Sequence, residues 1–322
     1  MTLSAFRTAI SYPYPTADPG NGFWGEQTST LNFCEETLIS SCRNAKNFKD
    51  YALTSYCAEL CNTVTNAIFM WLGIRGVVNC LQQKHPSIFL ISYLGYMVVG
   101  LGSILFHTTL KSVYDIHYLL DDACQLCILT FTNVLSSLGN WPAFACRFDH
   151  DDYFRIDWLR EAQIYYHVTK DPVFHQVAYA FLTATVVFRS MWVMESQLRP
   201  VLSARDPQQA AKVLNTMWAM IATGLSVFLG GFLIWNLDNV FCSQVRQLRH
   251  AVGLPWAVLF EGHAWWHLMT GLAYYYITWG TWLRHCLSGQ GSNYILVWPR
   301  VLTSVPYLQR VENGQDQDKK DQ

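Results

Sequence analysis

The chain has 322 residues, of which 51% are hydrophobic and only 14% carry a charge. A typical soluble domain has about 25% charged residues, so this composition argues against a soluble globular protein. The formal net charge is −1 and no basic stripe is present, which argues against a nucleic-acid partner. The apolar residues come in long runs, and this pattern indicates an integral membrane protein.

An N-terminal arm precedes the first apolar run. Its first 20 residues contain Pro13, Pro15 and Pro19 and no signal-peptide core, so we expect an irregular arm. Six apolar segments follow, each long enough for the roughly 20 residues that a bilayer-crossing helix needs. These segments lie at residues 60–80, 88–107, 118–138, 172–194, 213–236 and 255–283. The sequence thus predicts an all-α membrane protein with an arm at 1–57, a helical domain at 58–285 and a tail at 286–322, solvated and disordered from Glu312.

Ten cysteines lie at scattered spacings, mostly within the apolar segments. They do not form the disulfide framework of a small secreted domain. Cys124 and Cys127 form a C-x-x-C pair inside an apolar segment. Redox or zinc chemistry is one reading of this pair, but buried cysteine more often behaves as a small hydrophobe.

Three histidines stand near the ends of apolar segments. His107 ends the second one, while His263 and His267 lie near the start of the last one. The i, i+4 spacing of the second pair places both rings on one helical face. Polar side chains within membrane spans usually mark function. Three histidines with one open position are the ligand set of a hydrolytic zinc site, although a two-histidine pair alone is weak evidence.

Five long stretches of the chain carry a family resemblance. They are G-F-W-G-E-Q-T-S-T-L-N-F-C-E-E, A-E-L-C-N-T-V-T-N, G-S-I-L-F-H-T-T-L-K, G-F-L-I-W-N-L-D-N-V-F-C and H-A-W-W-H-L-M-T-G. A shorter one is D-P-V-F-H-Q-V at 171–177. With these stretches the chain resembles the alkaline ceramidases of the fungal type, a family of multispan membrane amidases. The matches extend over most of the chain in the family's order, and this co-occurrence is more specific than any one motif.

The resemblance implies a seven-transmembrane-helix bundle that hydrolyses the amide of ceramide or phytoceramide to a sphingoid base and a fatty acid. It also implies a membrane of the endoplasmic reticulum or Golgi and a zinc ion held by His107, His263 and His267. Ser103 and Asp121 occupy the positions of the family's active-site serine and aspartate. These residues are therefore the expected site.

Each of the two implied catalytic residues also has a simpler reading. Asp121 would take a proton from the attacking water and pass it to the leaving amine; alternatively, it caps the third helix, and Asp122 is a less favoured substitute. Ser103 shares a helical face with His107, so its hydroxyl could donate to the developing oxyanion. Its alternative role is a small residue that allows close helix packing. We interpret His175 as a polar contact within the bundle.

The resemblance further implies a calcium site where the arm meets the first helix. Oxygen donors of the kind that Ca²⁺ prefers occur there, although an ordinary acidic loop is the alternative. Asn32 stands where the family has an acidic residue, so one charge is lost. Asp50 is assigned by keeping the family's nine-residue spacing to the last ligand across an insertion after Glu36. The expected ligands are Asn32, the backbone carbonyl of Phe33, Glu35, Asp50 and Glu59.

The proposed ligands also constrain the topology. His107 and Asp121 lie at the membrane face where the chain starts, and His263 and His267 reach that face only if their span is odd-numbered. A seventh crossing is therefore expected between residues 139 and 171. That stretch is a poor span, because charged residues cost about 2.5–3.5 kcal/mol each at a helix centre. The four charged residues are Arg155, Asp157, Arg160 and Glu161.

These observations favour a zinc-dependent ceramide amidohydrolase whose lipid substrate enters from the bilayer. A seven-helix lipid receptor that holds a structural zinc without turnover is the alternative from another class. A third reading is an inactive family member in which the fourth span is missing, so that the zinc site cannot assemble.

Overall fold

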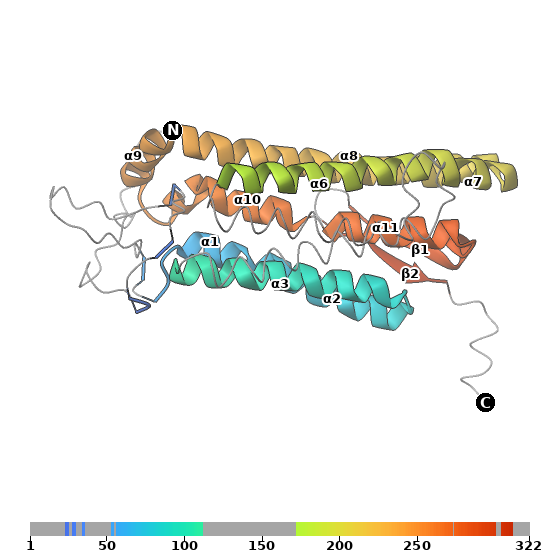
Figure 1. The fold of residues 1–322 in the computed structure, drawn as a ribbon, viewed down its shortest axis with the longest axis horizontal. Helices are drawn as coiled ribbons and strands as arrows, with labels where there is room; N and C mark the ends of the chain where they lie inside the picture. The colour runs from blue at the N-terminus through green and yellow to red at the C-terminus, as the bar shows by residue number, and fades with distance from the viewer. Residues whose placement is uncertain are drawn as a thin grey trace, which may run out of the picture. The chain divides into compact units, whose positions relative to one another are not determined.

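The computed structural model describes most of the chain and is mostly helical in that part (Figure 1). The N-terminal 20 residues, Cys124 and Cys127, the segments at 118–138 and 139–171 and the tail from Glu312 lie outside the described residues. The predictions made for them therefore remain predictions. The described residues are 23–25, 28–29, 34–35, 53–54, 56–111, 172–272, 274–300 and 304–311.

The first two predicted spans form helices. Residues 60–80 fold as α1 (Leu60–Thr65) followed by α2 (Ala67–Gln83), and residues 88–107 fold as α3 (Ser87–Thr109). Lys84 adopts the left-handed conformation that commonly ends a helix. Pro86 then precedes α3, where proline's fixed φ suits a helix start. Leu60–Gln83 and Ser87–Thr109 are each long and apolar enough to cross a membrane.

Small residues let α2 and α3 pack closely against each other. A Cβ atom at Gly76 would overlap the ring of Tyr93, and one at Gly100 would overlap the side chain of Phe69. Close approach at glycine is a usual means of helix association in membranes, where lipid is as apolar as the side chains. The short helix α1 contacts both α3 and α10 (Gly262–Gly271), which brings three distant segments together.

The next two described helices match the segments predicted at 172–194 and 213–236 in position but extend beyond them or continue into other elements. Residues 172–194 correspond to α6 (Pro172–Val193), which continues through the π-helix η2 (Met194–Leu198) into α7 (Arg199–Arg205). Residues 213–236 lie within the 34-residue helix α8 (Pro207–Val240), which is also apolar enough to cross a membrane. The amphipathic helix α9 (Cys242–Val252) follows, and a disulfide joins its first residue to Cys34.

The prediction of one helix over residues 255–283 is wrong. This segment contains the 3₁₀ turn η3 (Trp256–Phe260), α10 and α11 (Tyr274–Leu287). The hydroxyl of Tyr96 on α3 donates to the backbone carbonyl of Gly271, while the Tyr275 N–H donates to the Leu272 carbonyl. Hydropathy does not reveal this break, because the sequence is apolar on both sides of it.

The all-α prediction is also incomplete. After α11 come the 3₁₀ turn η4 (Gly291–Asn293) and the strands β1 (Tyr294–Val297) and β2 (Tyr307–Arg310), which pair as a two-stranded sheet. β1 reads Y-I-L-V, a short apolar and β-branched run that favours a strand. Seven helices remain a prediction, because the third and fourth expected spans lie outside the described residues.

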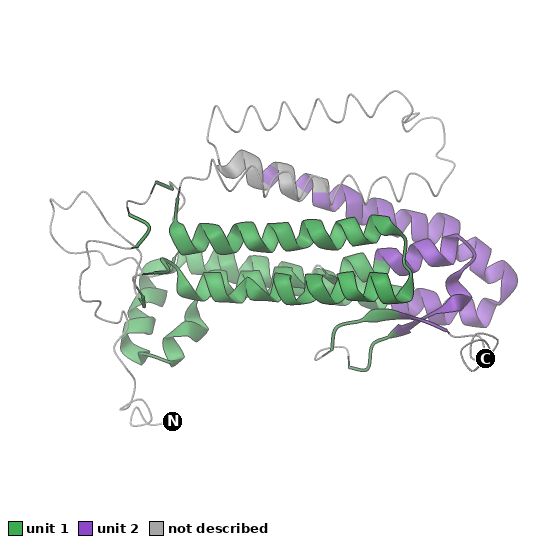
Figure 2. Cartoon of the chain, turned by 90° about the horizontal axis from the view of Figure 1, so that it is seen from below, with its two compact units in different colours: residues 1–126, 217–279, 297–308 green, residues 127–216, 280–296, 309–322 purple. Residues whose placement is uncertain are grey.

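The chain divides into two compact units (Figure 2). Residues 1–126, 217–279 and 297–308 form the first, which contains all three candidate zinc ligands. Residues 127–216, 280–296 and 309–322 form the second. The core of the first unit includes the aromatic residues Phe69, Tyr93, Tyr96, Tyr274 and Trp279, and the second unit buries Val193, Met194, Leu198, Ala210 and Leu214.

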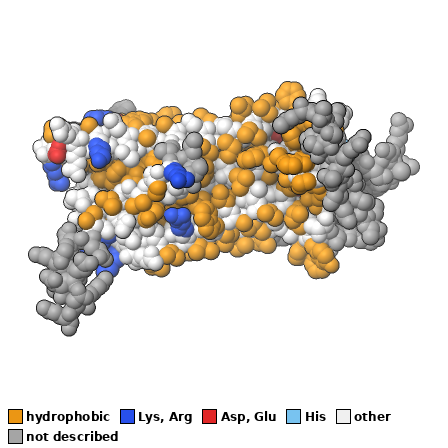
Figure 3. Space-filling model, turned by 180° about the vertical axis from the view of Figure 1, so that it is seen from behind, with side chains coloured by type: hydrophobic (Ala, Val, Ile, Leu, Met, Phe, Trp, Pro, Cys, Tyr) orange, Lys and Arg blue, Asp and Glu red, His pale blue; other side chains and the backbone are white. Residues whose placement is uncertain are grey.

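Many large apolar side chains are exposed on the helices of the first unit. Figure 3 shows hydrophobic side chains over much of one face, with few acidic ones among them. A soluble monomer rarely exposes apolar area on this scale, whereas lipid-facing helices do so by necessity. The exposed side chains on α2, α3 and α8 include Trp71, Leu81, Leu94, Leu101, Leu229 and Leu233.

Candidate metal centre

The structure brings the three histidines together. His107 lies in the last turn of α3, while His263 and His267 lie one turn apart on α10, and all three are buried. One ring nitrogen from each lies within 4.8 Å of the others. The ring centroids are 5.2 Å apart for His107 and His263, 4.7 Å for His107 and His267, and 4.5 Å for the α10 pair.

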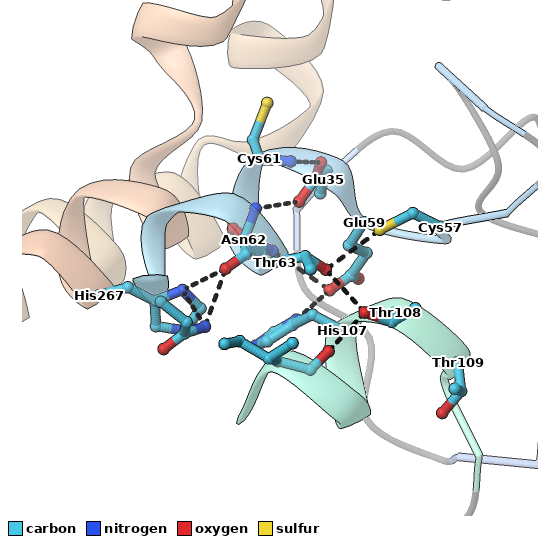
Figure 4. Close-up of polar contacts among 12 residues, drawn as sticks. Glu35, Cys57, Glu59, Cys61, Asn62, Thr63, His107, Thr108, Thr109 and His267 are labelled. Carbon is cyan, nitrogen blue, oxygen red and sulfur yellow. Dashed lines mark hydrogen bonds and ion pairs between the residues drawn. The ribbon is translucent and has the colours of Figure 1, made fainter. Parts of the chain in front are cut away.

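Two of the three imidazoles are held through Nδ1 (Figure 4). Nδ1 of His107 pairs with a carboxylate oxygen of Glu59. Nδ1 of His267 lies 3.0 Å from the backbone carbonyl oxygen of Asn62. A protonated Nδ1 suits both acceptors and directs the other ring nitrogen, Nε2, to a metal. Ligating histidines usually donate their second nitrogen to a carboxylate or a carbonyl in this way, so the donor set fits a zinc ion with an open fourth position.

Helix α1 places these supporting groups. It has six residues and lies against both α3 and α10. Besides the Asn62 carbonyl, it presents the Thr65 hydroxyl at 3.3 Å from His267 Nδ1. The Asn66 side-chain nitrogen lies 3.0 Å from the same ring atom and donates to the Asn62 carbonyl, so it holds the carbonyl that faces the ring. Sequence reasoning missed these partners. The available signal was the N-T-V-T-N run, in which two asparagines occupy adjacent turns of an apolar segment.

Glu35 ties the N-terminal arm to α1. Its two carboxylate oxygens accept hydrogen bonds from the backbone N–H groups of Cys61 at 3.1 Å and Asn62 at 3.3 Å (Figure 4). These are first-turn donors that lack a partner within the helix. Burial, together with the nearby carboxylates of Glu261 and Glu59, raises the pKa of Glu35 well above its ordinary value. A cation beside this carboxylate would favour its ionised form.

Two of the five expected calcium ligands are described. Glu35 and Glu59 are both buried, and both accept from Asn62: Glu35 from its backbone N–H and Glu59 from its side-chain amide at 3.2 Å. Asn32, Phe33 and Asp50 lie outside the described residues. Glu35 also belongs to a second group of possible metal ligands, with Cys61 and Glu261.

The structure describes one of the two expected catalytic residues, Ser103, and not the other, Asp121. Ser103 lies one turn before His107 on α3 and is half-buried, so the two residues share a helical face. Asp121 and its less favoured substitute Asp122 lie outside the described residues. The side chain of His175 on α6 is outside them as well.

Aromatic side chains line the metal centre on the side of α8. The ring of Trp235 lies 6.0 Å from His263 and stacks on Trp266 at 5.6 Å between centroids. Phe228 and Phe232 pack against Trp266 at 5.3 and 6.0 Å. The indole nitrogen of Trp235 is buried and has no acceptor within the described part of the chain. Such a surface suits an apolar ligand with a polar head.

A buried ionic cluster adjoins the first turn of α10. Arg249 of α9 pairs with Asp238 of α8 at 3.1 Å and with Glu261 at 3.0 Å. Sequence reasoning missed this cluster too. Asp238 stands in the apolar stretch W-N-L-D-N and Glu261 directly precedes G-H-A-W-W-H, and acidic residues in such positions are the signal that could have found it.

Comparison with known proteins gives a consistent result. The Ceramidase family matches residues 25–309. Alkaline ceramidase 3 of Mus musculus is 33% identical over 262 residues, which cover 79% of this chain and 83% of that protein. Alkaline ceramidase YPC1 of Saccharomyces cerevisiae is 28% identical over 292 residues (86% and 83%), and the alkaline ceramidase of Arabidopsis thaliana is 26% identical over 276 residues (85% and 90%).

Proposed function

The chain belongs to the ceramidase family, and on that premise we propose that it hydrolyses the amide bond of ceramide or phytoceramide. The products are a sphingoid base and a free fatty acid. The observation that carries this proposal is the convergence of three buried histidines from α3 and α10 beside an aromatic surface. Zinc held by His107, His263 and His267 is part of the proposal.

The residues of the centre suit this metal. When bound, zinc acts as a Lewis acid that activates water and polarises a carbonyl. Glu59 and the Asn62 carbonyl fix the ring orientations of His107 and His267. The contacts at Nδ1 also set the tautomer that presents Nε2.

We assign the proton transfer to Asp121 and the oxyanion contact to Ser103. Amide hydrolysis requires a base that removes a proton from the attacking water and an acid that protonates the leaving nitrogen. A carboxylate in the position of the family's aspartate can perform both steps in turn. The Ser103 hydroxyl, one turn from His107, would donate to the oxygen of the tetrahedral intermediate.

The substrate reaches this site from the bilayer. The helices that hold the histidines expose apolar side chains, so a two-chain lipid need not leave the membrane. Trp235 and Trp266 offer an apolar surface at the height of the metal ligands, and the Trp235 indole N–H can donate to a polar group of the lipid. We expect the protein in the endoplasmic reticulum or Golgi.

We also propose a calcium site at the junction of the arm and α1, formed by Glu35 and Glu59 with three residues of the arm. The support is a pair of buried carboxylates that share Asn62 as a donor. Buried charges require a counterion or hydrogen bonds, and Ca²⁺ prefers such oxygen ligands. The other proposed ligands are Asn32, the Phe33 carbonyl and Asp50.

The test is fatty-acid release from ceramide by the purified full-length protein in detergent, with metal content measured on the same samples. His263→Ala should lose both zinc and activity. His250→Ala is the matched control, because His250 is an exposed histidine of α9. A wild-type protein that binds about one zinc per chain but does not hydrolyse ceramide would favour the lipid-receptor reading. A folded wild-type protein that neither binds zinc nor hydrolyses ceramide would overturn the proposed function.

A further inference from the structure

The ionic cluster at the start of α10 is unusually deep for three charged side chains. Arg249 is fully buried, and Asp238 and Glu261 are 4% and 1% exposed. Burying charges is costly even when they are paired, and such clusters add little stability compared with apolar packing. A role other than stability is therefore the natural explanation for its position next to two metal ligands.

Asp238 lies against the first turn of α10 from another helix. Its carboxylate faces the backbone N–H groups of Gly262 and His263, the first two residues of α10, and its Oδ1 accepts from Arg249 Nη2. A carboxylate at this place interacts favourably with the helix dipole. The approach is close: a Cβ atom at residue 262 would lie 2.5 Å from the Asp238 Cβ, so only glycine fits.

Arg249 fixes the residues just before the helix. Its Nε and Nη2 atoms donate to the carbonyl of Phe260 at 3.1 and 2.9 Å, and Nη2 also contacts the Glu261 carboxylate. Nη1 donates to the carbonyl of Cys34, whose disulfide partner Cys242 begins α9. One guanidinium thereby links α8, α9, the arm and the turn that leads into α10.

We propose that Asp238 and Arg249 are positioning residues that set the first turn of α10 and hence the place of its two metal ligands. His263 is the second residue of this helix, so its ring moves with the first turn, and His267 follows one turn later. A shift of about 1 Å is enough to spoil a site of this kind. The inference rests on the proposed zinc centre and deepens it.

Two substitutions at one residue separate positioning from charge. Asp238→Ala removes the carboxylate that faces the first turn of α10, whereas Asp238→Asn keeps a side chain of the same shape with one acceptor oxygen. We expect Asp238→Ala to weaken zinc binding about 10–100-fold, the range typical of partners that orient metal ligands, and Asp238→Asn to restore most of it. Asn239→Ala is the control, because Asn239 is the exposed neighbour on α8.

The measurements are zinc affinity by chelator competition and the visible spectrum of the Co²⁺-substituted protein, which reports ligand geometry. Melting temperature and the Cys34–Cys242 disulfide, read by mobility without reductant, verify folding. Gly262→Ala is a second variant that leaves every charge in place; its added methyl should alter the Co²⁺ spectrum.

The outcomes distinguish this inference from the function on which it rests. A wild-type protein that binds no zinc refutes the proposed centre. Wild-type zinc affinity in folded Asp238→Ala, or an unchanged Co²⁺ spectrum in Gly262→Ala, overturns the positioning role alone. If Asp238→Ala does not fold, the Co²⁺ spectrum of Gly262→Ala tests the positioning role in its place.

Discussion

Replacing Glu59 with glutamine tests how the histidine at the end of α3 is held. The Glu59 carboxylate and Nδ1 of His107 form a pair in which both side chains are buried. Loss of such a partner costs about 10–100-fold in metal affinity, which corresponds to about 1.4–2.8 kcal/mol. Glutamine retains the shape and one acceptor oxygen, while it removes the charge and replaces the second oxygen with an NH₂ donor. We therefore expect zinc binding in Glu59→Gln to weaken about tenfold, at the lower end of that range.

The assay is competition for zinc between the purified protein and a coloured chelator. Calcium-free buffer without a second chelator keeps the proposed calcium site empty, so that the change in zinc affinity reports the contact between Glu59 and His107. The control is Glu195→Gln, since Glu195 forms a partly exposed pair with Arg199 on the second unit, and such surface pairs contribute only about 0–1 kcal/mol. Equal zinc affinity in Glu59→Gln and the wild type would refute the view that this carboxylate supports a metal ligand.

Three further predictions follow from the site and the fold. Asp121→Asn should abolish ceramide hydrolysis and leave zinc content unchanged; persisting turnover would exclude Asp121 as the base, and unchanged ceramide binding in this variant serves as its control. Glu35→Gln should remove any stimulation of activity by Ca²⁺ over an EGTA titration, and a calcium response like that of the wild type would exclude Glu35 as a ligand. Gly100→Ala should destabilise the α2–α3 pair by about 1–3 kcal/mol, as expected of overpacking, because its Cβ would overlap Phe69; thermal unfolding beside the exposed Leu101→Ala variant measures this.

The long apolar helices in the described part could be predicted because a bilayer-crossing helix needs about 20 apolar residues in a row. The runs that became α2, α3 and α8 are apolar enough that length and hydropathy identify them as candidate spans. The break between α10 and α11 could not be predicted in this way. At the break, the Gly271 carbonyl accepts a hydrogen bond from the Tyr96 hydroxyl, 175 residues away in sequence. Periodicity within one segment contains no information on such a contact.

The metal ligands of the candidate site could be predicted from the sequence, whereas the groups that hold their rings could not. The i, i+4 spacing already places His263 and His267 on one face, and α10 presents them so. The groups that hold the rings are harder to find. A backbone carbonyl such as that of Asn62 has no residue type to mark it, and it serves His267 only because α1 lies against α10. Glu59 was expected as a calcium ligand, while its contact with His107 joins residues 48 apart.

The location of the centre at helix ends has a physical reason. A membrane interior supplies no water for unpaired polar groups, so polar side chains gather where helices begin and end. The last carbonyls of α3, those of His107 and Thr108, accept hydrogen bonds from the N–H groups of Glu59 and Ala58 at 2.9 and 3.0 Å. Glu35 accepts from the start of α1 in the same way.

The same backbone groups that must be satisfied at these ends therefore bring carboxylates and imidazoles together. The backbone N–H of Glu59 donates to the His107 carbonyl, and the Glu59 carboxylate pairs with the imidazole of the same histidine. Asp238 lies against Gly262 at the start of α10 and thereby approaches His263. A lipid amidase needs an apolar surface for its substrate and polar groups for the hydrolysis. The ends of apolar helices provide both next to each other.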